Sequence, residues 1–290
     1  MPSSKSISGQ TQQRLELLGD RTRLEILLVL AQSHRHDPLS PSMPESDLRR
    51  RVGVADPGSF GYHLQQLADT FVDETDSGFR LTPLGTDVVG TVVAGLGEGP
   101  TIEPTPLGID CPGCDRPIQL SHADGRLQVG CADHHLNHPI RPNLLRERSP
   151  HDLAATAVLG LLQETESMRR GCCPLCAGHC ATTIESGDGD TPTSFGASCD
   201  SCGNHTTQPL GVLLARQPAS IALAEASGVD LTGLELVSWT LRGAVAPVQT
   251  PSTDRNVVTI ETETGAVTFT LDENARILDV DSSVCRATPN

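Results

Sequence analysis

The N-terminal third of the chain has the apolar periodicity of a small helical domain. Residues 11–33 carry leucines at helical spacing, and Asp20 divides this run into two helices because it is a good N-cap. A short third helix is expected to end at Gly53, and a fourth to begin with Pro57 at its first position. The pattern therefore predicts four helices before any strand.

Two short extended runs follow these helices. Residues 71–82 alternate around a turn sequence at 76–78, which predicts a hairpin, and Pro83 begins a fifth helix. Helices followed by a hairpin and a closing helix are the layout of a winged helix-turn-helix. We expect this DNA-binding domain over residues 10–95, and the glycine- and proline-rich residues 95–106 predict a linker after it.

Two CxxC pairs in the second half of the chain have the spacing of a zinc site. Cys173 and Cys176 form the first pair, and Cys199 and Cys202 form the second. Each short turn directs two thiolates at one ion, and four thiolates complete the tetrahedral shell of structural zinc. Gly203 suits the positive φ of such a turn. Two further thiols, Cys172 and Cys180, are left over from this set.

A second cluster lies earlier in the chain and has a less certain ligand set. Cys111, Cys114 and Cys131 provide three thiols, and His134 keeps the knuckle spacing after Cys131, so we expect it to be the fourth ligand. His135 and His138 are the alternatives, and three cysteines packed as small apolar residues without a metal are another.

The remaining patterns complete an α+β fold. Ser149 caps an expected helix, Pro218 begins a shorter one, and alternation over residues 234–280 predicts three or four strands in hairpins, with Trp239 opening a strand. We therefore expect four segments after the winged helix: a first zinc-ribbon-like subdomain (107–148), a linking helix (149–170), a second zinc-ribbon-like subdomain (171–215) and a C-terminal αβ module with antiparallel strands (216–283).

The fourth helix carries the candidate DNA contacts. Phe60, Leu64 and Leu67 are expected to face the core, and the other side is expected to present Ser59, Tyr62, His63 and Gln66. The Gln66 amide can pair with an adenine edge, and Arg80 on the hairpin is the expected phosphate contact.

Three segments resemble winged helix regulators of the arsenical-repressor (ArsR) type. They are LLGDRTRLEILLVL (17–30), GSFGYHLQQL (58–67) and FRLTPLG (79–85), and the resemblance covers about residues 10–95. It implies binding of double-stranded DNA as a homodimer. Metal-sensing members of the family carry a cysteine pair in the DNA-binding helices, whereas this chain has no cysteine before Cys111. Metal sensing by that domain is therefore not implied.

The whole arrangement also resembles a group of regulators from halophilic archaea, for which transcriptional regulation is the implied function. The composition agrees, since the net charge is −15 and a single lysine, Lys5, stands among 21 basic residues. At about 1 M salt the Debye length is about 3 Å, so the self-repulsion of an acidic chain is screened. At such a salt concentration, an acidic net charge argues less strongly against DNA binding.

These observations predict a cytoplasmic transcriptional regulator with two structural zinc ions. No run approaches the length of a membrane span, and clustered cysteines in a reducing compartment indicate metal. We expect no enzyme, because four protein ligands leave zinc no open position and HExxH is absent. The C-terminal half leaves room for an effector or a protein partner.

The alternative is a zinc-ribbon protein–protein adaptor whose winged helix does not bind DNA. The charges on the fourth helix and the hairpin discriminate between the two functions. A neutral or basic face favours DNA, whereas carboxylates across that face favour the adaptor.

Overall fold

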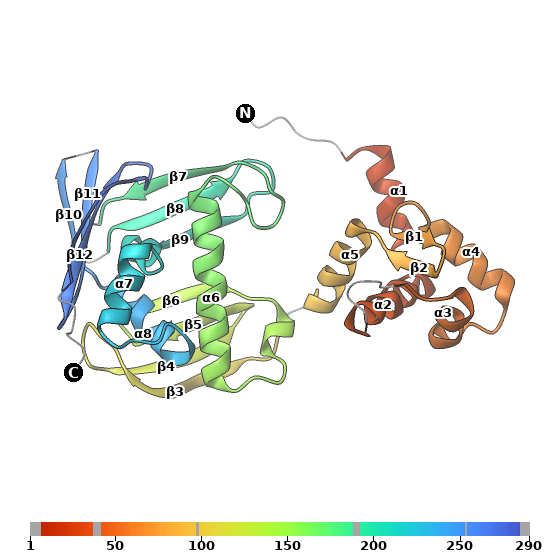
Figure 1. Cartoon of the computed structure of the whole chain (residues 1–290), viewed down its shortest axis with the longest axis horizontal. Helices are drawn as coiled ribbons and strands as arrows, with labels where there is room; N and C mark the ends of the chain where they lie inside the picture. Colours follow the sequence, from red (N-terminus) through yellow and green to blue (C-terminus); the bar gives the residue numbers. More distant parts are fainter. Residues whose placement is uncertain (1–6, 37–41, 97–98, 188–191, 253, 285–290) are drawn as a thin grey trace. The chain divides into compact units, whose positions relative to one another are not determined.

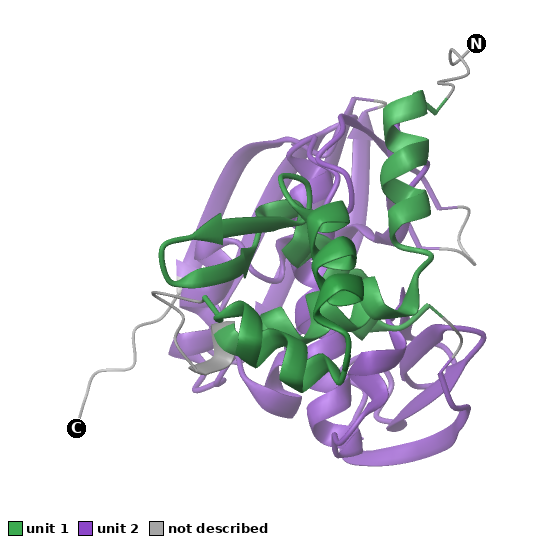
Figure 2. Cartoon of the chain, turned by 90° about the vertical axis from the view of Figure 1, so that its right-hand side faces the viewer, with its two compact units in different colours: residues 1–96 green, residues 97–290 purple. Residues whose placement is uncertain are grey.

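The computed structural model describes residues 7–36, 42–96, 99–187, 192–252 and 254–284. The chain divides into two compact units, residues 1–96 and residues 97–290, which Figure 2 colours separately. Across the described ranges the fold is mixed α/β, with eight α-helices and four antiparallel sheets. No helix in these ranges is long and apolar enough to cross a membrane.

The described residues of the first unit form five helices and one hairpin, in the order that the sequence predicts. Its elements are α1 (Gly9–Leu17), α2 (Arg21–His36), α3 (Glu45–Val52), α4 (Pro57–Leu67), β1 (Val72–Thr75), β2 (Gly78–Leu81) and α5 (Pro83–Ala94).

The predicted caps of the first unit are confirmed. The carboxylate of Asp20 accepts a hydrogen bond from the backbone N–H of Arg23, and Asp56 accepts one from that of Ser59. Gly53 ends α3 with a φ of 81°, in the left-handed region that glycine adopts readily. Phe60, Leu64 and Leu67 of α4 are buried, as expected from their spacing.

In the second unit, the described residues form three antiparallel sheets (Figure 1). The first consists of β3 (Ile102–Asp110), β4 (Pro117–Ala123), β5 (Arg126–Gly130) and β6 (His135–Pro139). The second consists of β7 (Cys180–Glu185), β8 (Ser194–Cys199) and β9 (His205–Pro209). The third consists of β10 (Val248–Ser252), β11 (Arg255–Thr262), β12 (Gly265–Asp272) and β13 (Ile277–Val284). In each sheet the strands lie in sequence order, as hairpins require.

Helices and short 3-10 turns connect these sheets. They are η1 (Pro142–Leu145), α6 (Pro150–Arg169), η2 (Leu210–Leu214), α7 (Pro218–Ala226) and α8 (Gly233–Ala244). The helix α6 contacts strands of both the first and the second sheet and packs along α8. Buried residues of all three sheets and of these helices form one hydrophobic core, so the cysteine-rich segments and the C-terminal segment share a single interior.

The loop between β12 and β13 closes one edge of the second sheet. The backbone N–H of Ile184 in β7 donates to the carbonyl of Glu273, and the Thr182 hydroxyl donates to that of Asn274. This edge of β7 is therefore bonded within the unit at two points.

Two expectations of the sequence analysis are wrong. Residues 233–244 form the helix α8, so Trp239 lies inside a helix and does not open a strand. Its indole N–H donates to the carbonyl of Ala215, which anchors α8 to the end of η2. The alternation that predicted strands lies within residues 257–281, and the prediction extended it too far towards the N-terminus.

The expected linker over residues 95–106 is the other error, since β3 already begins at Ile102. Proline cannot donate to a sheet ladder, which made Pro104 and Pro106 unlike strand residues. β3 is an edge strand of its sheet, however, and its pairing with β4 is irregular. An edge position tolerates prolines that a central strand would not.

We expect Gly211→Ala to destabilise the second unit. Gly211 and Gly243 meet where η2 crosses α8, and a Cβ on Gly211 would overlap the carbonyl oxygen of Gly243. Because backbone blocks the added methyl, the free energy of unfolding should fall by about 1–3 kcal/mol or more. Urea denaturation followed by circular dichroism measures this change.

Gly160→Ala in α6 is the matched control. The nearest atom to its added Cβ is the His138 Nε2, at 3.9 Å, and alanine favours a helix by about 1 kcal/mol over glycine. This variant should be as stable as the parent or more so. Equal destabilisation by both substitutions would contradict the close approach of η2 and α8.

Candidate metal centres and candidate nucleic-acid interface

Two groups of side chains in the second unit are candidate metal centres, and we number them in sequence order. The second metal centre is a group of four thiols at one end of the β7–β9 sheet. We define it as Cys173, Cys176, Cys199 and Cys202, whose sulfur atoms all lie within 4.8 Å of one another. The Sγ atoms of Cys173 and Cys202 are 3.7 Å apart, and those of Cys176 and Cys199 are 3.5 Å apart. The structure thus brings the four residues of the two CxxC pairs together.

Left-handed residues shape the turns that hold these thiols. Ala177 follows Cys176 with a φ of 55°, and Gly203 follows Cys202 with a φ of 74°. Each such turn directs backbone N–H groups at a sulfur, and the N–H of Ser201 lies 3.4 Å from the Cys199 Sγ. These donors stabilise thiolate charge.

The environment of the thiols separates their pKa values. Burial raises the pKa of Cys173, but the backbone N–H groups of Leu175 and Cys176, together with the thiols of Cys202 and Cys176, lower it to about 6. The N–H of Gly178 lowers the pKa of Cys176, whereas the neighbouring thiols of Cys202 and Cys199 raise it to about 12. Four thiolates so close together repel one another, so full ionisation requires a cation among them.

The first metal centre is the group of Cys111, Cys114, Cys131 and His134, whose ligand atoms also lie within 4.8 Å of one another. The His134 Nδ1 is 3.5 Å from the Cys111 Sγ and 3.9 Å from the Cys131 Sγ. The Sγ atoms of Cys114 and Cys131 are 3.6 Å apart. Asp115, directly after Cys114, has a φ of 55°, as Ala177 does in the second centre.

The structure places the two alternative histidines away from this group. His135 is exposed at the start of β6. His138 is buried against α6, with its Nε2 3.9 Å from the Glu164 Oε1. Burial and the nearby Arg126 lower the pKa of His138 to about 4.

Both groups fit a tetrahedral zinc ion. Zinc–sulfur bonds of about 2.3 Å and zinc–nitrogen bonds of about 2.0 Å give ligand separations of about 3.8 Å between sulfurs and about 3.5 Å between sulfur and nitrogen. The five separations given above, which are 3.5–3.9 Å, agree with these edges. The two groups are therefore compatible with two zinc sites.

Two cysteines near the second centre stay outside its group of four. Cys172 is exposed, and its Cα partner in a short bridge is His179. Cys180 is buried, and burial together with the neighbouring Cys199 and Cys173 raises its pKa to about 11. Cys285 lies outside the described residues.

The exposed face of α4 is uncharged. Ser59 and the 59% exposed Tyr62 lie on this face, and Gln66 is half-buried beside them. Gln65 is more exposed than Gln66 and was missed in the sequence analysis, although it lies three residues after Tyr62. These side chains carry hydroxyl and amide groups, which can donate to and accept from base edges.

His63 does not share this open face. Its side chain is 19% exposed, and its Nδ1 lies 3.5 Å from the Oδ1 of Asp20, the cap of α2. Its ring is edge-on to Tyr62, with the centroids 5.6 Å apart. The structure thus places His63 between α4 and α2, where it supports Tyr62.

The charges around α4 are mixed. Arg49 donates to the carbonyls of Val54 and Ala55 and so holds the turn before α4. Arg51 is exposed and, within the described ranges, has no carboxylate partner. On the hairpin, Arg80 lies 3.5 Å from Asp73 and shares the surface with two more carboxylates, those of Glu74 and Asp76.

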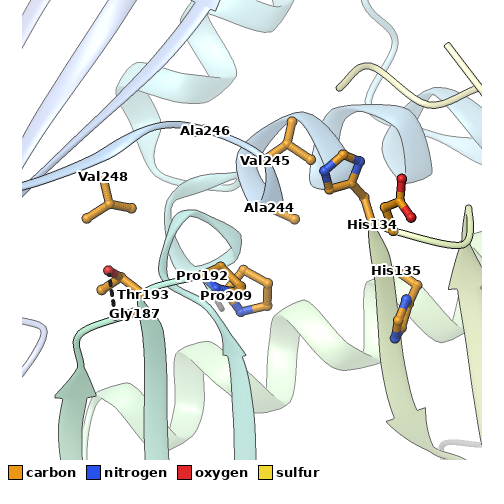
Figure 3. Close-up of a pocket in the computed structure, with 11 residues that line it drawn as sticks. His134, His135, Gly187, Pro192, Thr193, Pro209, Ala244, Val245, Ala246 and Val248 are labelled. Atoms are coloured by element: carbon orange, nitrogen blue, oxygen red, sulfur yellow. Dashed lines mark hydrogen bonds between the residues drawn. The ribbon is translucent and has the colours of Figure 1, made fainter. Parts of the chain in front are cut away.

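A pocket of about 690 Å³ borders the first centre (Figure 3). Its walls include His134 and His135 on one side and Val245, Ala246 and Val248 on another. The end of α8 packs closely here, because a Cβ on Gly113 would lie 3.0 Å from Val245 and 3.2 Å from His134.

These features define a protein of two units, of which the second carries two ligand groups compatible with zinc. Residues 108–277 match the family described as Domain of unknown function (DUF7351), and the chain belongs to this family. Residues 11–92 match a second family, Domain of unknown function (DUF7347). No curated protein matches the chain. Each family match lies within one of the two units.

We expect His134→Ala to reduce the zinc content of the purified protein from about two ions per chain to about one, because a structural site needs four ligands. His135→Ala is the matched control and should retain both ions. Elemental analysis after dialysis measures the content. Loss of zinc from His135→Ala or His138→Ala, with His134→Ala unaffected, would assign the fourth ligand to a different histidine.

His138 should make stability depend on pH. Its pKa is about 4 in the fold against 6.5 for an unburied histidine, so the unfolded chain binds more protons between these values. Stability should therefore fall as pH drops from 6.5 towards 4, by on the order of 3 kcal/mol. Urea denaturation of the parent and of His138→Gln over this range isolates the contribution, since Glu164 and the metal ligands are common to both. The exposed His205→Gln should keep the parent slope, and a parent slope in His138→Gln would refute the assignment.

Proposed function

We propose that the protein is a non-catalytic, DNA-binding transcriptional regulator, in which a winged helix reads the duplex and two structural zinc ions stabilise the second unit. The observation that carries DNA binding is the uncharged, hydrogen-bonding face of α4, formed by Ser59, Tyr62, Gln65 and Gln66. A helix of this kind fits the major groove without repelling phosphates.

The zinc ions are proposed from the completeness of the two ligand groups. Each group supplies four ligands at tetrahedral separations, which leaves no open position for a substrate or an activated water. Zinc bound there contributes to folding, because the ligands join segments that are distant in the sequence. The thiolates stay reduced in the cytoplasm, where we propose that the protein works.

A homodimer is proposed from the apolar surface of the first unit. The helix α1 has no buried residue, and Leu15 on it is 58% exposed. On α5, Leu84 is 40% exposed and Val93 is 43% exposed. Burial of such side chains against a second copy would remove apolar surface from water.

A protein–protein adaptor is the second candidate, and the hairpin supports it. Asp73 lies 3.5 Å from Arg80, and Glu74 and Asp76 are exposed on the same hairpin, so the hairpin has more carboxylates than guanidinium groups. Phosphate contact at this hairpin requires screening by salt or a cation. The pocket beside the first centre offers a place for an effector or a partner in either function.

We expect Gln66→Ala to weaken discrimination between DNA sequences by about 1–3 kcal/mol, if its amide pairs bidentately with a base. Arg80→Ala should weaken binding to all sequences alike and make the salt slope shallower by about one unit. Operator fragments selected from random DNA provide the ligand. Fluorescence anisotropy at several salt concentrations, up to molar salt, measures both effects.

Matched controls lie on the same unit, outside α4 and the hairpin. Gln13→Ala replaces an exposed glutamine of α1, and Arg21→Ala removes an arginine that pairs with Glu25, as Arg80 pairs with Asp73. Both should bind DNA like the parent. A folded parent protein that binds no DNA sequence at any salt concentration would favour the adaptor.

A further inference from the structure

Cys180 is a fifth cysteine at the second metal centre. It is the first residue of β7 and lies directly opposite Cys199, the last residue of β8 and a member of the group of four. Directly opposed residues of an antiparallel pair place their side chains on the same face of the sheet. Both side chains are buried, with exposures of 3% for Cys180 and 4% for Cys199.

The backbone hydrogen bonds identify Cys180 and Cys199 as a non-hydrogen-bonded pair of the antiparallel ladder. The N–H of Cys180 donates to the carbonyl of Gly171, and the N–H of Cys199 donates to that of Asn204. Both groups therefore point away from the shared ladder, as in a non-hydrogen-bonded pair, where the Cα atoms lie about 4.5 Å apart. Disulfides span Cα separations of about 4.4–6.8 Å, so these two strands can carry one without separating.

The other spare thiol does not have this relation to the centre. Cys172 is exposed, and His179, not a cysteine, is its Cα partner. The first centre also differs, since Cys111, Cys114 and Cys131 are the three cysteines that precede Cys172 in the sequence, and all three belong to its ligand group. Among the described residues, a buried cysteine that lies beside a complete ligand group but does not belong to it is thus found at the second centre and not at the first.

We propose that oxidation by a hydroperoxide joins Cys180 and Cys199 in a cross-strand disulfide, which removes Cys199 from the second centre and releases its metal ion. This inference rests on the proposed zinc at that centre. It makes the second centre redox-sensitive. Within the described part of the chain the first centre has no further cysteine beside it, and we expect it to keep its ion under the same treatment.

The chemistry balances with hydrogen peroxide as the oxidant. The Cys199 thiolate attacks one peroxide oxygen, the O–O bond breaks, and a sulfenic acid forms as hydroxide leaves and takes up a proton to become water. The Cys180 sulfur then attacks the sulfenic sulfur, the S–S bond forms, the S–O bond breaks, and a second water leaves with the Cys180 proton. Each of the two sulfur atoms loses one electron, and one peroxide molecule takes up both electrons and is reduced to two waters. The remaining Cys173, Cys176 and Cys202 are an incomplete shell for zinc.

The test uses the full-length zinc-loaded protein and about one equivalent of hydrogen peroxide, the stoichiometry of this oxidation. A chromogenic chelator follows zinc release, and mass spectrometry of alkylated peptides maps the disulfide. We expect release of about one of two ions per chain, a Cys180–Cys199 linkage, and recovery of zinc binding after reduction and zinc addition. Cys180→Ala should still hold two ions but release zinc about tenfold more slowly, because it lacks the intramolecular attack. Cys172→Ala is the matched control and should behave like the parent.

Two results would overturn the proposal: disulfides confined to the four ligands, or release from Cys180→Ala at the parent rate. If Cys180→Ala does not fold, the peptide map of the oxidised parent decides alone. Failure of the zinc assignment is distinguishable, because elemental analysis would show it before oxidation. In that case, mapping of the metal-free protein still shows whether Cys180 and Cys199 pair.

Discussion

The second unit depends on how the charge of its clustered thiols is compensated. Each ligand group lies where strands of one sheet end. Cys111 follows β3, Cys131 follows β5, and Cys199 closes β8. Without a cation, these ends carry groups whose ionisation is mutually unfavourable, and the neighbouring thiols of Cys202 and Cys199 raise the pKa of Cys176 for this reason. With a divalent ion, the same ends become crosslinks. The pairing of strands in two sheets therefore depends on the charge of the eight ligand side chains, and that charge depends in turn on how the strands are paired.

The helix α6 extends this dependence through the unit. It buries one face along most of its length, and the shared core includes Cys111 and Cys131 of the first centre as well as Cys173 and Cys199 of the second. Residues from all three sheets join this core, although aromatic residues make up only 2% of the chain. The composition excludes a large aromatic core. Aliphatic side chains packed around α6, together with the ligand groups at the strand ends, thus stabilise the unit in its place.

Local signals in the sequence predicted much of this architecture. Capping residues such as Asp20 and Asp56, the turn before β2, and the CxxC spacings act within a few residues, so the sequence alone shows them. Contacts distant in sequence determined the failures. Trp239 is helical because α8 packs on α6 and η2, and β3 tolerates prolines because it lies at a sheet edge. His63 turns towards the Asp20 carboxylate, which belongs to another helix. No periodicity within α4 could reveal that neighbour.

The hydrogen bonds between β7 and the loop after β12 protect one sheet edge against aggregation. An edge strand with free N–H and C=O groups can template pairing with a strand of another molecule. On β7 the N–H of Ile184 is already bonded to Glu273, and the Thr182 hydroxyl occupies the carbonyl of Asn274. A neighbouring chain would have to displace this loop before it could add a strand. The hairpin of one sheet thus protects the edge of another against intermolecular sheet growth, in a protein whose acidic surface alone gives little protection once salt has screened it.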